Sequence, residues 1–112
     1  MNIFSNIREA VRRGDYALRP HAVTHMLAEG FEEADIVETV GNGRIVEHYI
    51  EEDRCLIAGT FRISEKTEES LHIVADYWSE SGDIGWIDIV TAYIPRHPFW
   101  ETPYKRGRKK WN

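Results

Sequence analysis

Two histidines, His21 and His25, stand four residues apart in the segment PHAVTHMLAEG. On an α-helix, side chains at this spacing project to the same side, about 5–6 Å apart. Such a pair could chelate one divalent metal ion, exchange protons with a substrate, or lie on the polar face of an amphipathic helix. The spacing alone leaves all three interpretations open.

The metal interpretation lacks an essential residue. Zinc hydrolases that bind the metal through His-x-x-x-His carry a glutamate directly after the first histidine as general base, and Ala22 holds that place here. Glu29 lies one turn after His25, and His48 or His72 could come from another part of the chain, but no spacing identifies a third ligand. We therefore expect neither a metal nor another cofactor.

The proton-transfer interpretation uses the position of His21, which directly follows Arg19 and Pro20 and so falls in the first turn of the predicted helix. The free N–H groups of a helix N-terminus attract phosphate and disfavour a positive charge on a nearby ring. A neutral imidazole can accept the proton of a ribose 2′-hydroxyl, while arginine neutralises the phosphate and a second histidine or a tyrosine protonates the leaving oxygen. RNA cleavage by this route needs no metal.

The residues around the histidines predict helices in the first part of the chain. Apolar residues recur at helical spacing in residues 3–13 and 20–29, and Pro20 suits the first position of the second helix. A third helix is expected between Gly30 and Gly41, because acidic residues crowd its first turn. The histidine pair then lies on the second of three helices.

Further along the chain, the pattern changes to short β-rich runs separated by polar turns. We predict four strands, over residues 44–50, 54–63, 71–78 and 86–94. The short connections favour hairpins, and the segment 16–19 is long enough only for a link or a short edge strand. The sequence therefore predicts an α+β fold in which N-terminal helices pack on one face of a four-stranded antiparallel sheet.

Length and charge indicate one domain with a distinct tail. At 112 residues and 42% hydrophobic content, we expect a single α+β domain over residues 1–94 and a basic, aromatic-bearing tail over residues 95–112. The tail carries a charge of +5 and the body −10, which gives the net charge of −5. An acidic body binds polyanions poorly, whereas the tail could contact RNA or a partner, or lie on the acidic body itself.

The sequence also predicts the compartment. No apolar run is long enough for a membrane span or a signal peptide, and the single Cys55 can form no internal disulfide. We therefore expect a cytoplasmic protein that does not contact a membrane.

Several segments follow one another in a recognisable order: RPHAVTHMLAEGFEEADIVETVGNGRIVEHY, CLIAG, LHIVA, DIVTAYIP and FWETPYKRGRKK. Together they resemble the bacterial domain-of-unknown-function family 4258, over residues 16–110. The resemblance implies a helix-plus-sheet fold similar to the small ribonuclease toxins of the RelE and barnase-like group. It brings no settled activity with it.

The resemblance also carries over to single positions. His21 matches the family histidine, His72 the histidine of the Leu-His strand, and Thr91 and Tyr93 the closing strand, while Arg54 precedes the Cys-Leu strand.

At three further positions the chain departs from the family pattern. Arg19 stands where the family has a serine helix cap, and His25 and Glu29 stand where it has arginines. Two basic groups that would face a phosphate are thus a titratable ring and a carboxylate here.

The leading hypothesis is a toxin-like, metal-independent endoribonuclease or RNA-contacting protein. His21 would be the base and His25 or His72 the acid, with Arg54 and Tyr93 as further catalytic groups. Contacts with RNA or a partner are expected from Arg19, Arg62, Lys105, Arg106, Arg108, Lys109 and Lys110. A cognate inhibitor protein and a homo-oligomer are further partners that this hypothesis allows.

The alternative is a non-enzymatic module that binds a partner or a second copy of itself through its basic C-terminal arm. In that case His72 could lie on the wet face of a strand, and Arg54 and Arg62 could pair with cross-strand carboxylates. Trp100 and Tyr104 could dock the tail on the domain or on a partner subunit.

Overall fold

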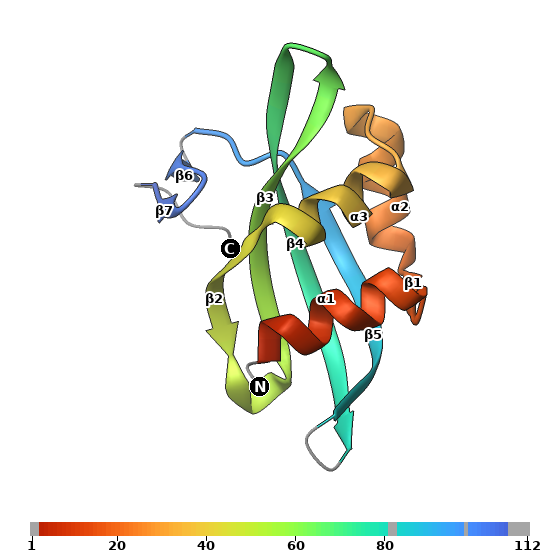
Figure 1. Ribbon diagram of the computed structural model, residues 1–112. Coiled ribbons are helices and arrows are strands. Elements are labelled where there is room, and N and C mark those ends of the chain that lie inside the picture. Colours follow the sequence, from red (N-terminus) through yellow and green to blue (C-terminus); the bar gives the residue numbers. More distant parts are fainter. Residues whose placement is uncertain (1–2, 81–82, 98, 108–112) are drawn as a thin grey trace.

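Helices and strands form one α+β unit in the computed structural model, which describes residues 3–80, 83–97 and 99–107 (Figure 1). The helices are α1 (Ile3–Arg13), α2 (Pro20–Glu29) and α3 (Glu33–Asn42), with a short 3₁₀ turn, η1 (Ile50–Glu52). The strands are β1 (Tyr16–Leu18), β2 (Arg44–Tyr49), β3 (Arg54–Ser64), β4 (Thr67–Glu80), β5 (Asp83–Tyr93), β6 (Trp100–Thr102) and β7 (Lys105–Arg106). None of the described helices has the length and apolarity that crossing a membrane requires.

The three helices follow the local signals in the sequence. Helix α2 begins at Pro20, whose fixed φ suits the first helical position, and Gly30 follows its last residue with a φ of 80°. Helix α3 begins with a capping box, in which the side chains of Glu32 and Asp35 each accept a backbone N–H of the other residue. It ends at Asn42, one residue beyond the predicted end.

The predicted four-stranded antiparallel sheet was wrong in one respect. The sheet has five strands in the order β1-β5-β4-β3-β2, and β1 runs parallel to β5. Strands β2 to β5 are antiparallel to one another, as predicted. Residues 16–18 pair with residues 87–89, and three residues are too few to show the alternation that identifies a strand in a sequence.

The main core lies between the sheet and the helices α1 and α3, which cross the sheet in Figure 1. Helix α2 instead packs along β5, beyond the short β1. The fully buried core side chains include Ile7, Ile36, Ile57, Ile73, Ile87 and Ile89. On the other face of the sheet, Leu56 and Ala58 are also buried, although they belong to no helix-side cluster.

A C-terminal hairpin, formed by β6 and β7, covers part of this second face. Trp100 of β6 is only 2% exposed, and its ring is perpendicular to the His72 ring, with 4.3 Å between centroids. The guanidinium of Arg106 donates two hydrogen bonds to Glu47 of β2, at 2.7 and 2.9 Å. The described part of the predicted tail therefore lies on the acidic body of the same chain.

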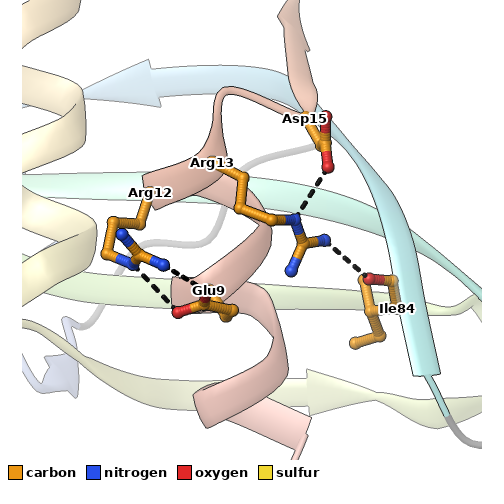
Figure 2. A network of polar contacts seen from close by, with 5 residues as sticks. All are labelled: Glu9, Arg12, Arg13, Asp15 and Ile84. Carbon is orange, nitrogen blue, oxygen red and sulfur yellow. Dashed lines mark hydrogen bonds and ion pairs between the residues drawn. The ribbon is translucent and has the colours of Figure 1, made fainter.

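Arg13, the last residue of α1, attaches that helix to the sheet, as Figure 2 shows. Arg13 donates to the carboxylate of Asp15 at 2.9 Å and to the carbonyl of Ile84 in β5 at 3.4 Å. The neighbouring Arg12 pairs with Glu9 within the helix, which lowers the pKa of that carboxyl through the hydrogen bond. The Arg13 contacts fix the point where the chain turns from α1 into β1.

The end of α3 approaches β3 so closely that two glycines are required. A Cβ built on Gly59 would lie 2.6 Å from the carbonyl oxygen of Thr39 and 2.7 Å from the side-chain oxygen of Asn42. A Cβ on Gly43 would lie 2.7 Å from the carbonyl oxygen of Ala58. Backbone atoms at these distances cannot move aside without shifting the helix.

Replacing Gly59 with alanine is therefore expected to lower the free energy of unfolding by about 1–3 kcal/mol, because the extra methyl overpacks this contact. Urea unfolding followed by circular dichroism measures the change. Gly85→Ala is the matched control, since no heavy atom lies within 4 Å of the added Cβ in that strand. Equal stability of the two variants would contradict the close approach.

Candidate functional site

One cavity brings several of the predicted site residues together. It has a volume of about 610 Å³ and lies between α2, the strands β4 and β5, and the segment that follows β5. The polar side chains in its wall include His21, His25, Glu29, Thr91, Tyr93 and Arg96. A volume of this size is typical of small-molecule sites.

The histidine pair of α2 forms one side of this cavity. The ring centroids of His21 and His25 lie 4.9 Å apart. Nδ1 of His25 lies 2.8 Å from a carboxylate oxygen of Glu29, one turn further along the helix. The other carboxylate oxygen of Glu29 accepts the backbone N–H of Ile94 at 3.2 Å, which holds the carboxylate in place.

This contact determines which nitrogen of His25 can react. A carboxylate oxygen only accepts hydrogen bonds, so the proton of a neutral His25 ring belongs on Nδ1. Nε2 then carries the lone pair, and none of the residues that the structure describes forms a hydrogen bond with it. The pair of His25 and Glu29 thus has the arrangement of a general base with an orienting carboxylate.

His72 lies behind the cavity wall and not on the wet face of a strand. It is fully buried, and its Nε2 donates to the carbonyl of Pro103 at 2.6 Å. Because Nε2 carries the proton, Nδ1 is the acceptor for the hydroxyl of Tyr93 at 3.2 Å. The structure therefore joins His72 and Tyr93 to the C-terminal hairpin and keeps His72 out of reach of a ligand.

Burial determines the protonation of this pair. Desolvation lowers the pKa of His72, and the positive charge of Arg106 acts in the same direction, while the hydrogen bond to Pro103 opposes them. Burial likewise raises the pKa of Tyr93 to about 12. Both side chains are thus neutral near pH 7, and His72 is unsuited to act as the acid that the sequence analysis allowed.

The lowered pKa of His72 predicts a dependence of stability on pH. Below the ordinary histidine pKa of 6.5, the unfolded chain binds the proton more readily than the folded chain. The contribution of His72 to stability is therefore present above that pH and is lost as the pH falls through the lower folded-state pKa. Urea unfolding between about pH 7.5 and about pH 5.5 measures the slope, which His72→Gln is expected to flatten. The exposed His97→Gln serves as control, and an unchanged slope in His72→Gln would count against this account.

Three predicted arginines lie outside the cavity wall. Arg54 donates two hydrogen bonds to Asp76 on the neighbouring strand, at 2.6 and 3.0 Å, as the cross-strand alternative expected. Arg19 lies 3.7 Å from a carboxylate oxygen of Asp88. Arg62 is exposed on β3. Their charges are thus not gathered around His21 and His25.

The basic residues of the tail divide into three groups. Arg106 lines the cavity, but its ion pair with Glu47 raises its pKa and lowers the pKa of that carboxyl. Lys105 pairs with Glu101 at 3.3 Å within the hairpin. Arg108, Lys109 and Lys110 lie outside the described residues.

Three polar residues of the cavity wall, Glu29, Arg96 and His97, are absent from the predicted catalytic and binding residues. Arg96 had no motif around it, and only its basic charge was visible in the sequence. From the sequence, Glu29 is only a possible metal ligand and a departure from a family arginine, although its spacing of four residues from His25 could have indicated the pair. Within residues 3–80, 83–97 and 99–107, no three His, Cys, Asp or Glu side chains gather so that they could hold a metal ion.

Comparison with known proteins gives one match. The model of a family described as Domain of unknown function (DUF4258) matches residues 18–94, which run from β1 to the residue after β5 and include both histidines of α2. No curated protein and no solved structure matches the chain. The matched region exceeds half of the 112 residues, and the chain therefore belongs to the DUF4258 family.

Proposed function

We propose that the cavity beside α2 cleaves RNA without a metal, by proton transfer through the two histidines of its wall that lie on α2. The observation that carries this proposal is the meeting of His21 and His25 at one cavity, with Glu29 orienting the second ring. Two imidazoles this close can both reach the atoms around a single phosphodiester. A toxin-like endoribonuclease is therefore the function that this geometry supports best.

The contacts of His25 indicate which of the two rings is the base and which is the acid. Nε2 of His25 takes the proton from the ribose 2′-hydroxyl, and the 2′-oxygen attacks the adjacent phosphorus. The bond from phosphorus to the 5′-oxygen breaks, and protonated His21 gives that oxygen its proton. The products are a 2′,3′-cyclic phosphate and a free 5′-hydroxyl. These roles are the reverse of those expected from the sequence, because Glu29 orients His25 and not His21.

Arg96 supplies the positive charge in this proposal. It lines the cavity and follows β5 by three residues. A guanidinium can donate two hydrogen bonds to the oxygens of a phosphate and stabilise the charge that develops during attack. Arg106 contributes less, since Glu47 already accepts two of its hydrogen bonds.

The test uses the full chain and labelled RNA in the presence of EDTA. We expect cleavage to continue, with 2′,3′-cyclic phosphate ends on the fragments. A strand of the same length with 2′-deoxyribose at every position, that is, DNA, is expected to remain intact, because it lacks the attacking hydroxyl. Loss of cleavage with EDTA would indicate a metal mechanism, and cleavage of the deoxy strand would contradict attack by the 2′-oxygen.

Replacing Glu29 with glutamine is expected to slow cleavage about tenfold to hundredfold. The substitution removes a charge-assisted hydrogen bond, which contributes about 1.5–3 kcal/mol, and each 1.4 kcal/mol of barrier corresponds to about a factor of ten. Single-turnover rates measure the effect. Glu38→Gln on the exposed side of α3 changes the charge equally and is expected to keep the wild-type rate. Equal rates for the two variants would show that Glu29 does not orient the base.

A second candidate function is a self-associating module, and an exposed tryptophan pair favours it. Trp78 and Trp86 lie directly opposite each other near the β4–β5 turn and are 52% and 41% exposed. Asp83 shares their groove, and Asp88 accepts the indole N–H of Trp86 at 3.1 Å. Indole faces and carboxylates both attract cations. The occupant that fits this charge is the basic segment 108–110 of a second copy.

Self-association is measured by light scattering during size-exclusion chromatography over a range of concentrations. This candidate predicts a dimer that dissociates in Trp78→Ala and in the triple variant R108A/K109A/K110A. Ser70→Ala, on the same strand, is the control and is expected to leave the mass unchanged. A wild-type chain that remains monomeric throughout the range would exclude the candidate.

A further inference from the structure

The cavity wall contains more residues than proton transfer around a phosphate requires. Besides its polar groups, the wall includes Ala28, Val74, Ile94 and Phe99, and most of its surface is apolar. A phosphate needs charged and hydrogen-bonding partners and gains nothing from apolar surroundings. The apolar part of the wall therefore fits some other group of the same ligand.

Aromatic rings in the wall indicate which kind of chemical group would bind there. The rings of His25 and Tyr93 lie 6.5 Å apart between centroids, and Phe99 lies in the segment that closes the cavity after β5. Planar side chains of this kind bind planar heterocycles by stacking, whatever the sequence of the nucleic acid. At about 610 Å³, the cavity also exceeds the size of a phosphate group several times.

We propose that the cavity holds one unstacked nucleobase next to the phosphate, so that the substrate is single-stranded RNA. The inference rests on the proposed ribonuclease function and names its substrate class. In an A-form duplex the bases stay stacked and the major groove is too narrow for side chains to enter, whereas a single strand can turn a base outward. His25 then meets the ribose of the same nucleotide, and Phe99 contacts its base.

Binding is tested with a 2′-O-methyl RNA strand, which has no free 2′-hydroxyl and resists this cleavage. Fluorescence anisotropy compares the strand alone, the same strand in a blunt duplex, and an abasic strand of equal length. We expect the strand with bases to bind at least about tenfold more tightly than either of the others, because stacking contributes a factor of this order per base. Equal affinity for the strand with bases and the abasic strand would overturn the inference.

A pair of phenylalanine variants tests whether Phe99 contacts the base. Phe99→Ala is expected to weaken binding of the single strand about tenfold and to leave binding of the abasic strand unchanged. Phe4→Ala removes an equal side chain from α1, where Phe4 stacks with Arg8, and is expected to bind like wild type. An equal effect of Phe99→Ala on both strands would contradict a base contact.

The two proposals fail in different ways. Tight, base-dependent binding through Phe99 without cleavage of unmodified RNA would support the base site and refute the ribonuclease. Cleavage that is equally fast in single strands and duplexes would support the ribonuclease and refute the base site.

Discussion

Replacing His25 with alanine is expected to lower kcat/KM for RNA cleavage about 10²- to 10⁴-fold, the range that a general base contributes. The variant lacks Nε2, the ring nitrogen that faces away from the Glu29 contact and that accepts the proton of the 2′-hydroxyl in the proposed mechanism. Its fold is expected to persist, because alanine is the best helix former and His25 is not part of the buried core. Single-turnover cleavage and thermal unfolding measure the two effects separately.

Further variants in the same helix make this result specific. His21→Ala is expected to lose activity to a similar degree, and the double variant is expected to lose little more than either single variant, because the two rings act as a unit. Thr24→Ala is the control, since Thr24 is exposed between the histidines and donates only to the backbone of Pro20. Full activity in both single histidine variants would refute the mechanism.

Replacing Trp100 with alanine is expected to have the largest effect on stability, with a loss of about 3–5 kcal/mol in the free energy of unfolding. The indole is almost fully buried, meets the ring of His72, and has the guanidinium of Arg106 on its face at 4.5 Å. Its removal leaves a cavity over β3 and β4 and releases the hairpin. Urea unfolding measures the loss.

Tyr104 provides a control for the tryptophan variant in the same hairpin. Its ring is 46% exposed and contacts the guanidinium of Arg44 at 4.0 Å. Tyr104→Ala is therefore expected to cost less than about 1 kcal/mol, since an exposed cation–π contact is worth about 0.5–1 kcal/mol. Equal losses in the two variants would mean that the hairpin does not dock through Trp100.

The helices and the four antiparallel strands could be predicted because their signals are local. Pro20 and Gly30 mark the ends of α2, and the spacing of His21 and His25 already indicates that both side chains face the same way. Strand β1 could not be predicted with equal certainty. Its hydrogen bonds to β5 join residues about seventy positions apart, and a three-residue run has no pattern of its own.

The environment of His72 could not be predicted from local sequence signals either. Alternation in β4 indicates which face of the sheet His72 occupies, but it does not reveal what covers that face. The cover comes from Pro103 and Trp100, near the other end of the chain, and no local signal connects them to His72. Sequence patterns therefore identified the histidine pair on α2, whereas the wall around the pair became visible only in three dimensions.

The cavity wall comes from two parts of the chain, and the family match covers only one of them. Helix α2 and the strands lie within residues 18–94, which the DUF4258 model covers, while Phe99, Trp100 and Arg106 lie beyond them. Grafting the segment after β5 from another family member would therefore exchange Arg96, His97 and Phe99 and leave His21 and His25 untouched. Under the proposed function, such chimeras are expected to change the preferred substrate while the scaffold stays constant.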